Sequence, residues 1–309
     1  MRVDHIFEEP FEKNRKFILH YGDITDTNSV NSIIRKIKPN EIYNLAAQSH
    51  VSVSFETPEY TANADALGAL RVLESIKTNG LEKNVKFYQA GTSEMFGNQG
   101  AKFLNEDSKL QPVSPYGAAK LYAHWITKIY RDAYKIFASN GILFNHESPR
   151  RGETFVTKKI VVGLCKIKLG MQKKLVLGNL KAERDWGHAK DYVEAMYKIL
   201  QQKNPGDYIV ATGHKLSVKS FVQLVSKKLD STIKWSGKDI NEKGLNSKNK
   251  VIVECDKKYF RPLEVETLKG NSSKARRILK WKPKYSINQT VNEMVNATLD
   301  NLKNNKDIY

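Results

Sequence analysis

The sequence predicts an α/β protein with a doubly wound parallel sheet and a smaller α/β domain toward the carboxyl terminus. Two observations lead to this fold class. Short apolar, β-rich segments alternate with helical stretches over much of the 309 residues, as in a parallel sheet covered by helices on both faces. Hydroxyl, carboxylate and phenol side chains follow several of these segments, and open α/β sheets bind ligands at the carboxyl ends of their strands.

The strands expected in the main sheet are short and rich in β-branched or aromatic residues. They lie at residues 17–21, 41–46, 85–90, 142–145 and 208–212. The helices between them end at turn-forming pairs such as Lys38-Pro39 and Asn79-Gly80. We expect these helices over residues 27–37, 60–78 and 191–202, with a long helix from Ser114-Pro115 to about residue 137.

The remaining elements are less regular. We expect a strand at residues 178–185 and a helix over residues 218–228. Residues 236–250 hold Gly, Asn, Ser and Lys with few apolar residues, so we expect an exposed loop there.

Composition narrows the class of protein. Lys and Arg exceed Asp and Glu by 18, but the lysines are scattered, so we interpret the excess as a solvated surface and expect no nucleic-acid partner. No apolar stretch approaches about 18 residues, so no membrane span is expected. Cys165 and Cys255 form no CxxC pair, which favours a reducing, cytoplasmic setting. There is no HExxH motif and no Cys/His cluster, so we predict no metal site.

The chemistry is indicated by a tyrosine, a lysine, a threonine and a glutamate. Tyr116 and Lys120 are four residues apart, so they project from one face of the predicted helix, and a nearby ammonium lowers the pKa of a phenol. Thr92 and Glu94 follow the strand at 85–90. The four side chains would converge on one crevice, where a Tyr/Lys pair can move a proton while a hydride leaves the same carbon. The alternative is that Thr92 only caps a helix and Glu94 is a surface carboxylate.

Longer motifs make the resemblance specific. They are LAAQSHV (45–51), TSE (92–94), SPYGAAK (114–120), NHESPRRGETFV (145–156), RDWGHAKDY (184–192) and YFRPLEVETLKGN (259–271). With these motifs the chain resembles, over essentially its whole length, the GDP-mannose 4,6-dehydratases of the extended short-chain dehydrogenase/reductase family. The resemblance implies an NADP-binding Rossmann-like domain (1–148 with about 187–212) and a sugar-nucleotide domain (149–186 and 213–309).

The resemblance also implies a hydro-lyase reaction. GDP-mannose becomes GDP-4-keto-6-deoxymannose with loss of water, as a step toward GDP-deoxysugars such as GDP-fucose, and NADP is recycled. Tyr116 would take the proton of the sugar 4-hydroxyl, Lys120 would lower the Tyr116 pKa and bind the nicotinamide ribose, and Thr92 would bond the 4-oxygen. Glu94 would then remove the C5 proton and help expel the C6 hydroxyl.

Binding residues follow from the same resemblance, position by position. For NADP they are Asp23 and Ile24 at the adenine, Leu45, Ala46, Ala47, Gln48 and Ser49 at the pyrophosphate, Tyr60 at a phosphate or ribose, and His146 and Arg151 near the nicotinamide. For GDP-mannose they are Ser93, Asn145, Glu147, Lys159, Arg184, Arg261 and Glu264. A homodimer or homotetramer is implied as well. His50, His124 and His188 lack metal-ligand spacing and are interpreted as structural.

Alternatives remain at this stage. Glu94 favours a dehydratase over an epimerase, which needs only the Tyr, Lys and hydroxyl set, but a neighbouring sugar-nucleotide enzyme or a non-catalytic remnant stays open. The family pattern begins with a strand, a GxxGxxG turn and a second strand, and about the first 40 residues of that pattern are absent here. We therefore expect the strand at 17–21 to lack its neighbours, with a start codon assigned too late or a disrupted gene as explanations.

Overall fold

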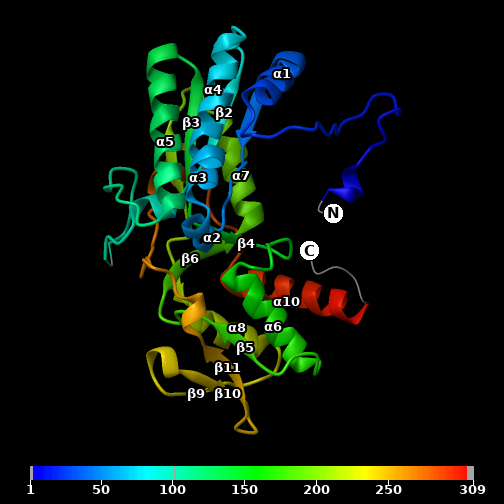
Figure 1. Cartoon of the computed structure of the whole chain (residues 1–309), viewed down its shortest axis with the longest axis vertical. Helices are drawn as coiled ribbons and strands as arrows, with labels where there is room; N and C mark the ends of the chain where they lie inside the picture. Colours follow the sequence, from blue (N-terminus) through cyan, green and yellow to red (C-terminus); the bar gives the residue numbers. More distant parts are fainter. Residues whose placement is uncertain (1–2, 101, 305–309) are drawn as a thin grey trace.

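The main sheet of the computed structural model, which describes residues 3–100 and 102–304, is parallel (Figure 1). Its strands are β1 (Glu41–Asn44), β2 (Lys86–Thr92), β3 (Phe137–Leu143) and β7 (Asp207–Val210), in the order β1-β2-β3-β7. Tyr88 of β2 pairs in register with Tyr43 on one side and Ser139 on the other. The predicted fold class is confirmed.

Helices cover both faces of this sheet because neighbouring strand residues point to opposite sides. Phe87 packs with apolar residues of α1 (Thr27–Ile37), α4 (Gly68–Thr78) and α5 (Pro115–Tyr134). Tyr88, the next residue, packs with α7 (Ala189–Leu200) and with Ala275 of α9 (Ser273–Ile278). Figure 1 shows α4 and α5 running alongside β2 and β3.

Local signals explain where these helices begin and end. The Asp26 side chain caps α1 by accepting from the Asn28 N–H, and Lys38 ends it in the left-handed conformation. Ser114 caps α5 in the same way, with Pro115 in its first turn. The predicted helix over 60–78 forms as three joined segments, α3 (Pro58–Thr61), the π-helical η2 (Ala62–Leu67) and α4.

Two boundary predictions in this region are corrected. The long helix ends at Tyr134, and β3 begins at Phe137 rather than at residue 142. The sequence hides the start of β3 because Ser139 and Asn140 are polar. Both are fully buried, and the Asn140 side-chain amide donates to Asp207 Oδ1 at 2.8 Å, so buried hydrogen bonds replace the apolar pattern.

The strand predicted at residues 17–21 does not form, so that prediction is wrong. Ile18 and Leu19 are about half exposed and Tyr21 is fully exposed. The N–H groups of Lys16 and Phe17 donate to the Glu8 carboxylate, each at 2.7 Å. A strand needs a neighbour for its backbone groups, and among the described residues β1 pairs with β2 alone.

A second group of elements lies below the main sheet in Figure 1. Helices α6 (Val156–Lys168), α8 (Val218–Lys228) and α10 (Ile287–Lys303) share one apolar core with a sheet ordered β5-β11-β10-β9. The strands of that sheet are β5 (Leu175–Leu177), β9 (Lys234–Ser236), β10 (Lys243–Leu245) and β11 (Val251–Cys255). The loop predicted at 236–250 is therefore wrong in part, since β10 pairs with two strands and its Gly244 is buried against Ile233 and Val253.

A small sheet joins the two groups of elements. It holds β4 (Asn145–Glu147), β6 (Glu183–His188) and β8 (Lys215–Ser217) in the order β4-β6-β8. The strand predicted at 178–185 is thus observed as β6, displaced toward the carboxyl terminus. The remaining short helices are η1 (Asp4–Ile6), α2 (Val51–Glu56), η3 (Ser93–Phe96), η4 (Asp239–Asn241) and η5 (Lys257–Tyr259). None of the helices in the described residues is both long and apolar enough to cross a membrane. The domain boundaries given above stay a prediction.

Candidate active site

Thr92 and Glu94 lie at the carboxyl end of β2. Thr92 is the last residue of the strand and caps η3, its Oγ1 accepting from the Glu94 N–H at 3.2 Å. Thr92, Ser93 and Glu94 are all buried. Thr92 therefore has the capping role weighed above, but Glu94 is not a surface carboxylate, and both remain available to a buried reaction centre.

Tyr116 and Lys120 reach the same place from the first turns of α5. A side-chain hydrogen bond joins Tyr116 to Thr92. Lys120 Nζ donates to the Ala90 carbonyl oxygen at 3.2 Å and lies 5.9 Å from the centre of the Tyr116 ring. Both side chains are buried. The structure thus brings together all four residues that the sequence proposes for catalysis.

Burial dominates the ionisation of this pair. The pKa of Tyr116 is raised, first by burial and then by the charges of Asp65 and Glu94, while the Thr92 hydrogen bond and Arg151 oppose the shift. Burial also lowers the pKa of Lys120, and Asp65 opposes that shift. Desolvation disfavours the charged form of each group. The net direction for Tyr116 is opposite to the one expected from the Tyr/Lys spacing.

Two arginines surround Glu94. Arg184 Nε lies 3.8 Å and Arg261 Nη1 lies 4.0 Å from Glu94 Oε1. Glu264 holds the same two guanidinium groups, at 3.1 Å from Arg184 Nη2 and 3.3 Å from Arg261 Nη1. Arg184, Arg261 and Glu264 are all predicted to bind the sugar nucleotide. They form a cluster of alternating positive and negative charges around Glu94, the predicted base.

A third element, β4, contributes His146 and Glu147. His146 stacks on Tyr192 at 4.7 Å, and its Nδ1 lies 3.0 Å from the Phe144 carbonyl oxygen. Burial lowers the pKa of His146, which favours the neutral imidazole. Glu147 accepts from Thr157 Oγ1 at 2.6 Å and lies 3.2 Å from Arg151 Nε. Glu147 is fully buried, so in this structure it positions Arg151.

The other predicted residues lie in three places. Leu45 and Tyr60 are exposed, and Gln48 donates its N–H to Asp65. Asp23, at the start of α1, is exposed and accepts from Thr25 N and Oγ1, each at 2.8 Å, and the carbonyl of Ile24 accepts from Arg71. Lys159, on α6, has its Nζ 3.4 Å from the centre of the Tyr259 ring.

Sequence analysis missed one residue of this site, Asp65. It is buried in η2 and acts electrostatically on both Tyr116 and Lys120. A signal was present, because Asp65 is the single charged residue of the small apolar run ANADALGA (62–69). A charge within such a run needs a buried partner.

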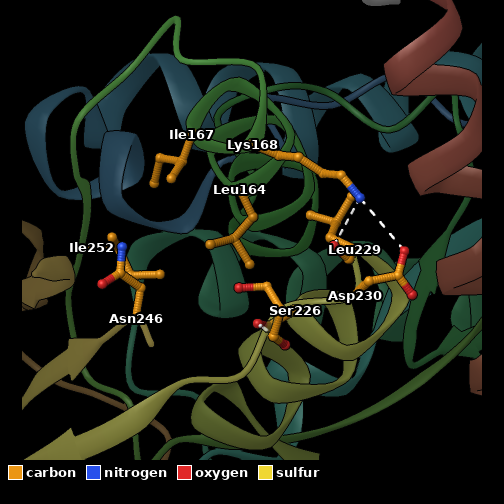
Figure 2. A pocket seen from close by; sticks show the side chains of 9 residues that line it. Leu164, Ile167, Lys168, Ser226, Leu229, Asp230, Asn246 and Ile252 are labelled. Atoms are coloured by element: carbon orange, nitrogen blue, oxygen red, sulfur yellow. Dashed lines mark hydrogen bonds and ion pairs between the residues drawn. The ribbon is translucent and has the colours of Figure 1, made fainter. Parts of the chain in front are cut away.

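A separate cavity lies between α6, α8 and β11 (Figure 2). It has a volume of about 350 Å³ and is lined by residues such as Leu164, Ser226 and Ile252. At its rim Lys168 Nζ donates to the Leu229 carbonyl oxygen at 2.8 Å and lies 3.6 Å from Asp230 Oδ2. The cavity shares no residue with the site described above.

The chain is similar in sequence to proteins of known activity. The sequence model of a family described as GDP-mannose 4,6 dehydratase matches residues 1–294. The GDP-mannose 4,6-dehydratase of Vibrio cholerae is 50% identical over 305 residues, which are 95% of this chain and 82% of that protein. The human GDP-mannose 4,6 dehydratase is 50% identical over 98% of this chain and 82% of its own.

Solved structures with the same fold are more distant in sequence. RMD from Pseudomonas aeruginosa, complexed with NADPH, superposes with a TM-score of 0.78 at 19% identity, covering 92% of this chain and 89% of its own. DesIV, a dTDP-glucose 4,6-dehydratase from Streptomyces venezuelae with NAD and TYD bound, has a TM-score of 0.78 at 18% identity, covering 96% and 84%. The match to the family over nearly the whole chain confirms the resemblance drawn from the motifs: the chain belongs to the GDP-mannose 4,6-dehydratase family.

Proposed function

We propose that this chain converts GDP-mannose to GDP-4-keto-6-deoxymannose with loss of water, the hydro-lyase reaction after which its family is named. One observation carries the proposal: Thr92, Glu94, Tyr116 and Lys120 converge, buried, where β2 and α5 meet. The carboxylate distinguishes this set from one that only oxidises and reduces a sugar hydroxyl. Elimination of water needs a base for the C5 proton in addition to one for the 4-hydroxyl.

The first step is oxidation at C4 of the sugar. Tyr116 accepts the proton of the 4-hydroxyl, and Thr92, already bonded to Tyr116, holds the 4-oxygen. The buried ammonium of Lys120 favours the anionic phenol electrostatically. A nicotinamide cofactor, when bound, would supply the hydride chemistry, with His146 and Arg151 placed to hold its nicotinamide end.

The second step is elimination. The 4-ketone acidifies the C5 proton, which Glu94 removes, and the C6–oxygen bond breaks as the hydroxyl leaves with a proton as water. The guanidinium groups of Arg184 and Arg261 hold the Glu94 carboxylate in place. A hydride from the bound nicotinamide would be needed at C6 and a proton at C5 to complete the reaction, so the sugar would lose one water with no net change in oxidation state.

We assign NADP as the cofactor. The buried Nδ1 of His50 and Oδ2 of Asp65 lack hydrogen-bond partners in the described residues, which fits a polar ligand at the carboxyl end of β1. His146 and Arg151 would hold the nicotinamide and its ribose, Leu45, Ala46, Ala47, Gln48 and Ser49 the pyrophosphate, Tyr60 a phosphate or ribose, and Asp23 and Ile24 the adenine. The printed sequence has no GxxGxxG motif, so the assignment rests on these residues and on the related fold of RMD, which was solved with NADPH.

The sugar nucleotide would bind on the opposite side of Glu94. Arg184, Arg261 and Lys159 offer positive charge to a diphosphate, and burial lowers the pKa of Lys159. Ser93, Asn145, Glu147 and Glu264 complete the proposed set, although Glu147 and Glu264 already hold arginines in this structure.

We also propose a homodimer. Tyr122, Trp125 and Ile129 are exposed on α5 and spaced so that they lie along one side of the helix. An exposed aromatic and aliphatic stripe of this kind marks a contact surface, and a second copy of α5 would cover it. A homotetramer would need a further contact. We place the enzyme in the cytoplasm, where it would supply GDP-deoxysugars such as GDP-fucose.

Turnover is tested by mass. The purified chain is mixed with GDP-mannose and NADP, and the mass of the sugar nucleotide is followed; loss of one water is the expected result. dTDP-glucose and UDP-glucose in parallel separate the proposal from a neighbouring dehydratase or epimerase. Binding of GDP-mannose without any mass change would contradict the proposal and favour a non-catalytic remnant.

A further inference from the structure

Asn98 joins two parts of the candidate active site that are far apart in the sequence. Its side-chain Nδ2 donates to the Glu264 carbonyl oxygen at 2.9 Å, and its Oδ1 accepts from the Glu266 N–H at 2.9 Å. A carbonyl oxygen can only accept and a backbone N–H can only donate, so the two contacts fix the orientation of the amide. One side chain therefore pairs with two backbone groups of the same segment, as a neighbouring strand would.

The loop that carries Asn98 begins at the predicted base. Glu94 lies in η3, and Gly97 follows that helix with a φ of +61°. A Cβ at Gly97 would clash with the Gln111 carbonyl oxygen, so this position requires glycine. The chain thus leaves η3 through a turn of fixed shape, and Asn98 follows directly after it.

The segment of residues 264–266 belongs to the proposed sugar-nucleotide site. Glu264 Oε1 lies 3.3 Å from Arg261 Nη1 and 3.1 Å from Arg184 Nη2. The same two guanidinium groups lie beside Glu94, at 4.0 Å and 3.8 Å from its Oε1. A shift of this segment would therefore move the charges that surround the predicted base.

Other hydrogen bonds hold the backbone on each side of the Asn98 contacts. Arg184 Nη1 donates to the Val265 carbonyl oxygen at 2.8 Å. Further along the same loop, the Leu104 backbone makes two hydrogen bonds with residues 269–271, at 2.9 Å and 2.7 Å. Loss of the Asn98 amide should therefore loosen the backbone around Val265 locally and leave the fold intact.

We infer that Asn98 is a positioning residue for the proposed sugar-nucleotide substrate. Its amide holds residues 264–266 against the loop after η3, and thereby sets the distance from Arg261 to Glu94. A diphosphate bound by Arg261 would then place its sugar within reach of the base. The inference rests on the proposed function, and Asn98 acts through the backbone without contacting the ligand.

The first test replaces Asn98 with a side chain of similar size that cannot form hydrogen bonds. Asn98 is exposed, so water competes for both bonds and the effect is modest. Asn98→Leu should raise the Kd for GDP-mannose, measured by titration calorimetry, about five- to tenfold. KM should rise in parallel, while kcat should stay within about threefold of wild type, because the four residues proposed for catalysis lie on β2, η3 and α5.

Gln99→Met is the matched control. Gln99 is the neighbouring amide, and its Nε2 donates to the Phe96 carbonyl oxygen and to Gln111 Oε1, each at 3.0 Å, within its own loop. Its substitution should leave the Kd within about twofold of wild type. If Asn98→Leu lowered the melting temperature but left the Kd as unchanged as the control does, Asn98 would be merely structural and the inference would be overturned.

The second test needs neither ligand nor turnover. Hydrogen exchange of the Glu266 N–H, followed by NMR, reports on its bond to Asn98. Asn98→Asp keeps an oxygen that can accept from this N–H and Asn98→Leu does not, so exchange should be about tenfold faster in Asn98→Leu. Equal exchange in the two variants would overturn the inference. Absence of turnover in wild type would instead overturn the proposed function, because the Kd and the exchange rate are measured without turnover.

Discussion

The two edge strands of the main sheet, β1 and β7, differ in whether other parts of the chain bond to their outer backbone groups. At β7, the Glu106 side chain accepts from the Ile209 N–H at 2.8 Å, and Leu104 bridges to Gly270 beside it. At β1, the described residues place no strand or side chain of this kind, and residues 18–21 are exposed and form no strand. The backbone groups of the β7 edge are therefore paired. The catalytic candidates lie at neither edge, because β2, which carries Thr92, is an inner strand between β1 and β3.

The difference predicts where substitutions matter. Side chains held between β2, β3 and α5 are buried and bonded to one another, so their loss affects chemistry or stability directly. Beyond β1, residues 18–21 and the proposed adenine contact Asp23 are exposed, while Ile24 is partly buried against the apolar core. Substitutions on the two sides should therefore give effects of different size.

The largest expected effect is that of Tyr116→Phe. The phenyl ring keeps the packing of α5 but removes the proton acceptor, so kcat should fall about a thousandfold, within the range for loss of a general base. Dehydration of GDP-mannose, followed by mass, gives the rate. Tyr122→Phe, an exposed position on the same helix, is the matched control and should stay within twofold of wild type. A Tyr116→Phe enzyme that is nearly as fast would remove Tyr116 from the mechanism.

The second-largest effect is expected from removal of the ion pair between α5 and β7. Arg131 donates to both carboxylate oxygens of Asp207, each at 3.0 Å, and Asn140 donates to one of them. Asp207→Ala should reduce the free energy of unfolding by about 3 kcal/mol, since it leaves a largely buried guanidinium unpaired. Urea unfolding at pH 7 measures it, with Asp132→Ala, an exposed neighbour of Arg131, as control. Equal free energies of unfolding for the two variants would contradict the conclusion that the Arg131–Asp207 ion pair stabilises the contact between α5 and β7.

The same pair predicts a pH dependence. Burial raises the pKa of Asp207, but the Arg131 hydrogen bonds and charge together outweigh it, so the net shift is downward from 3.8. A lowered folded-state pKa gives stability that is present above the unfolded value and lost as pH falls through the folded one. Wild type should thus lose stability below about pH 4 more steeply than Asp207→Ala.

Glu94→Gln should have an intermediate effect on catalysis. Loss of the C5 base is expected to lower dehydration about a hundredfold, while Tyr116, Thr92 and Lys120 could still remove the 4-hydroxyl proton during oxidation of C4 by a bound nicotinamide. Exchange of the C5 hydrogen with deuterium from solvent separates the two steps and should fall with the overall rate. If C5 exchange in Glu94→Gln matched that of wild type, another group would be the base.

Some parts of the fold and of the candidate site could be predicted from the sequence, and others could not. The TSE and SPYGAAK motifs identified the catalytic group because strand ends and helix starts place such residues together in any parallel α/β sheet. The start of β3 was missed because Asn140 is polar, so the strand lacks an apolar pattern there. Its hydrogen bond to Asp207 depends on the tertiary structure and cannot be read from the sequence. Asp65 was missed because Tyr116 and Lys120, the groups whose pKa it affects, lie more than 50 positions later in the sequence. The strand expected at residues 17–21 failed for the opposite reason, because local β propensity cannot supply a neighbouring strand.

The smallest expected effect lies in that segment. Leu19 is 56% exposed and contributes to no apolar cluster of the described residues. Leu19→Ser should change the free energy of unfolding by less than about 0.5 kcal/mol, whereas Phe87→Ala, on the inner strand β2, should cost about 3 to 5 kcal/mol because it empties a fully buried site. Urea unfolding of both variants under the same conditions measures the two changes in the free energy of unfolding. A large loss from Leu19→Ser would mean that residues 17–21 pack in solution, and the contrast between the two sides of the sheet would then be wrong.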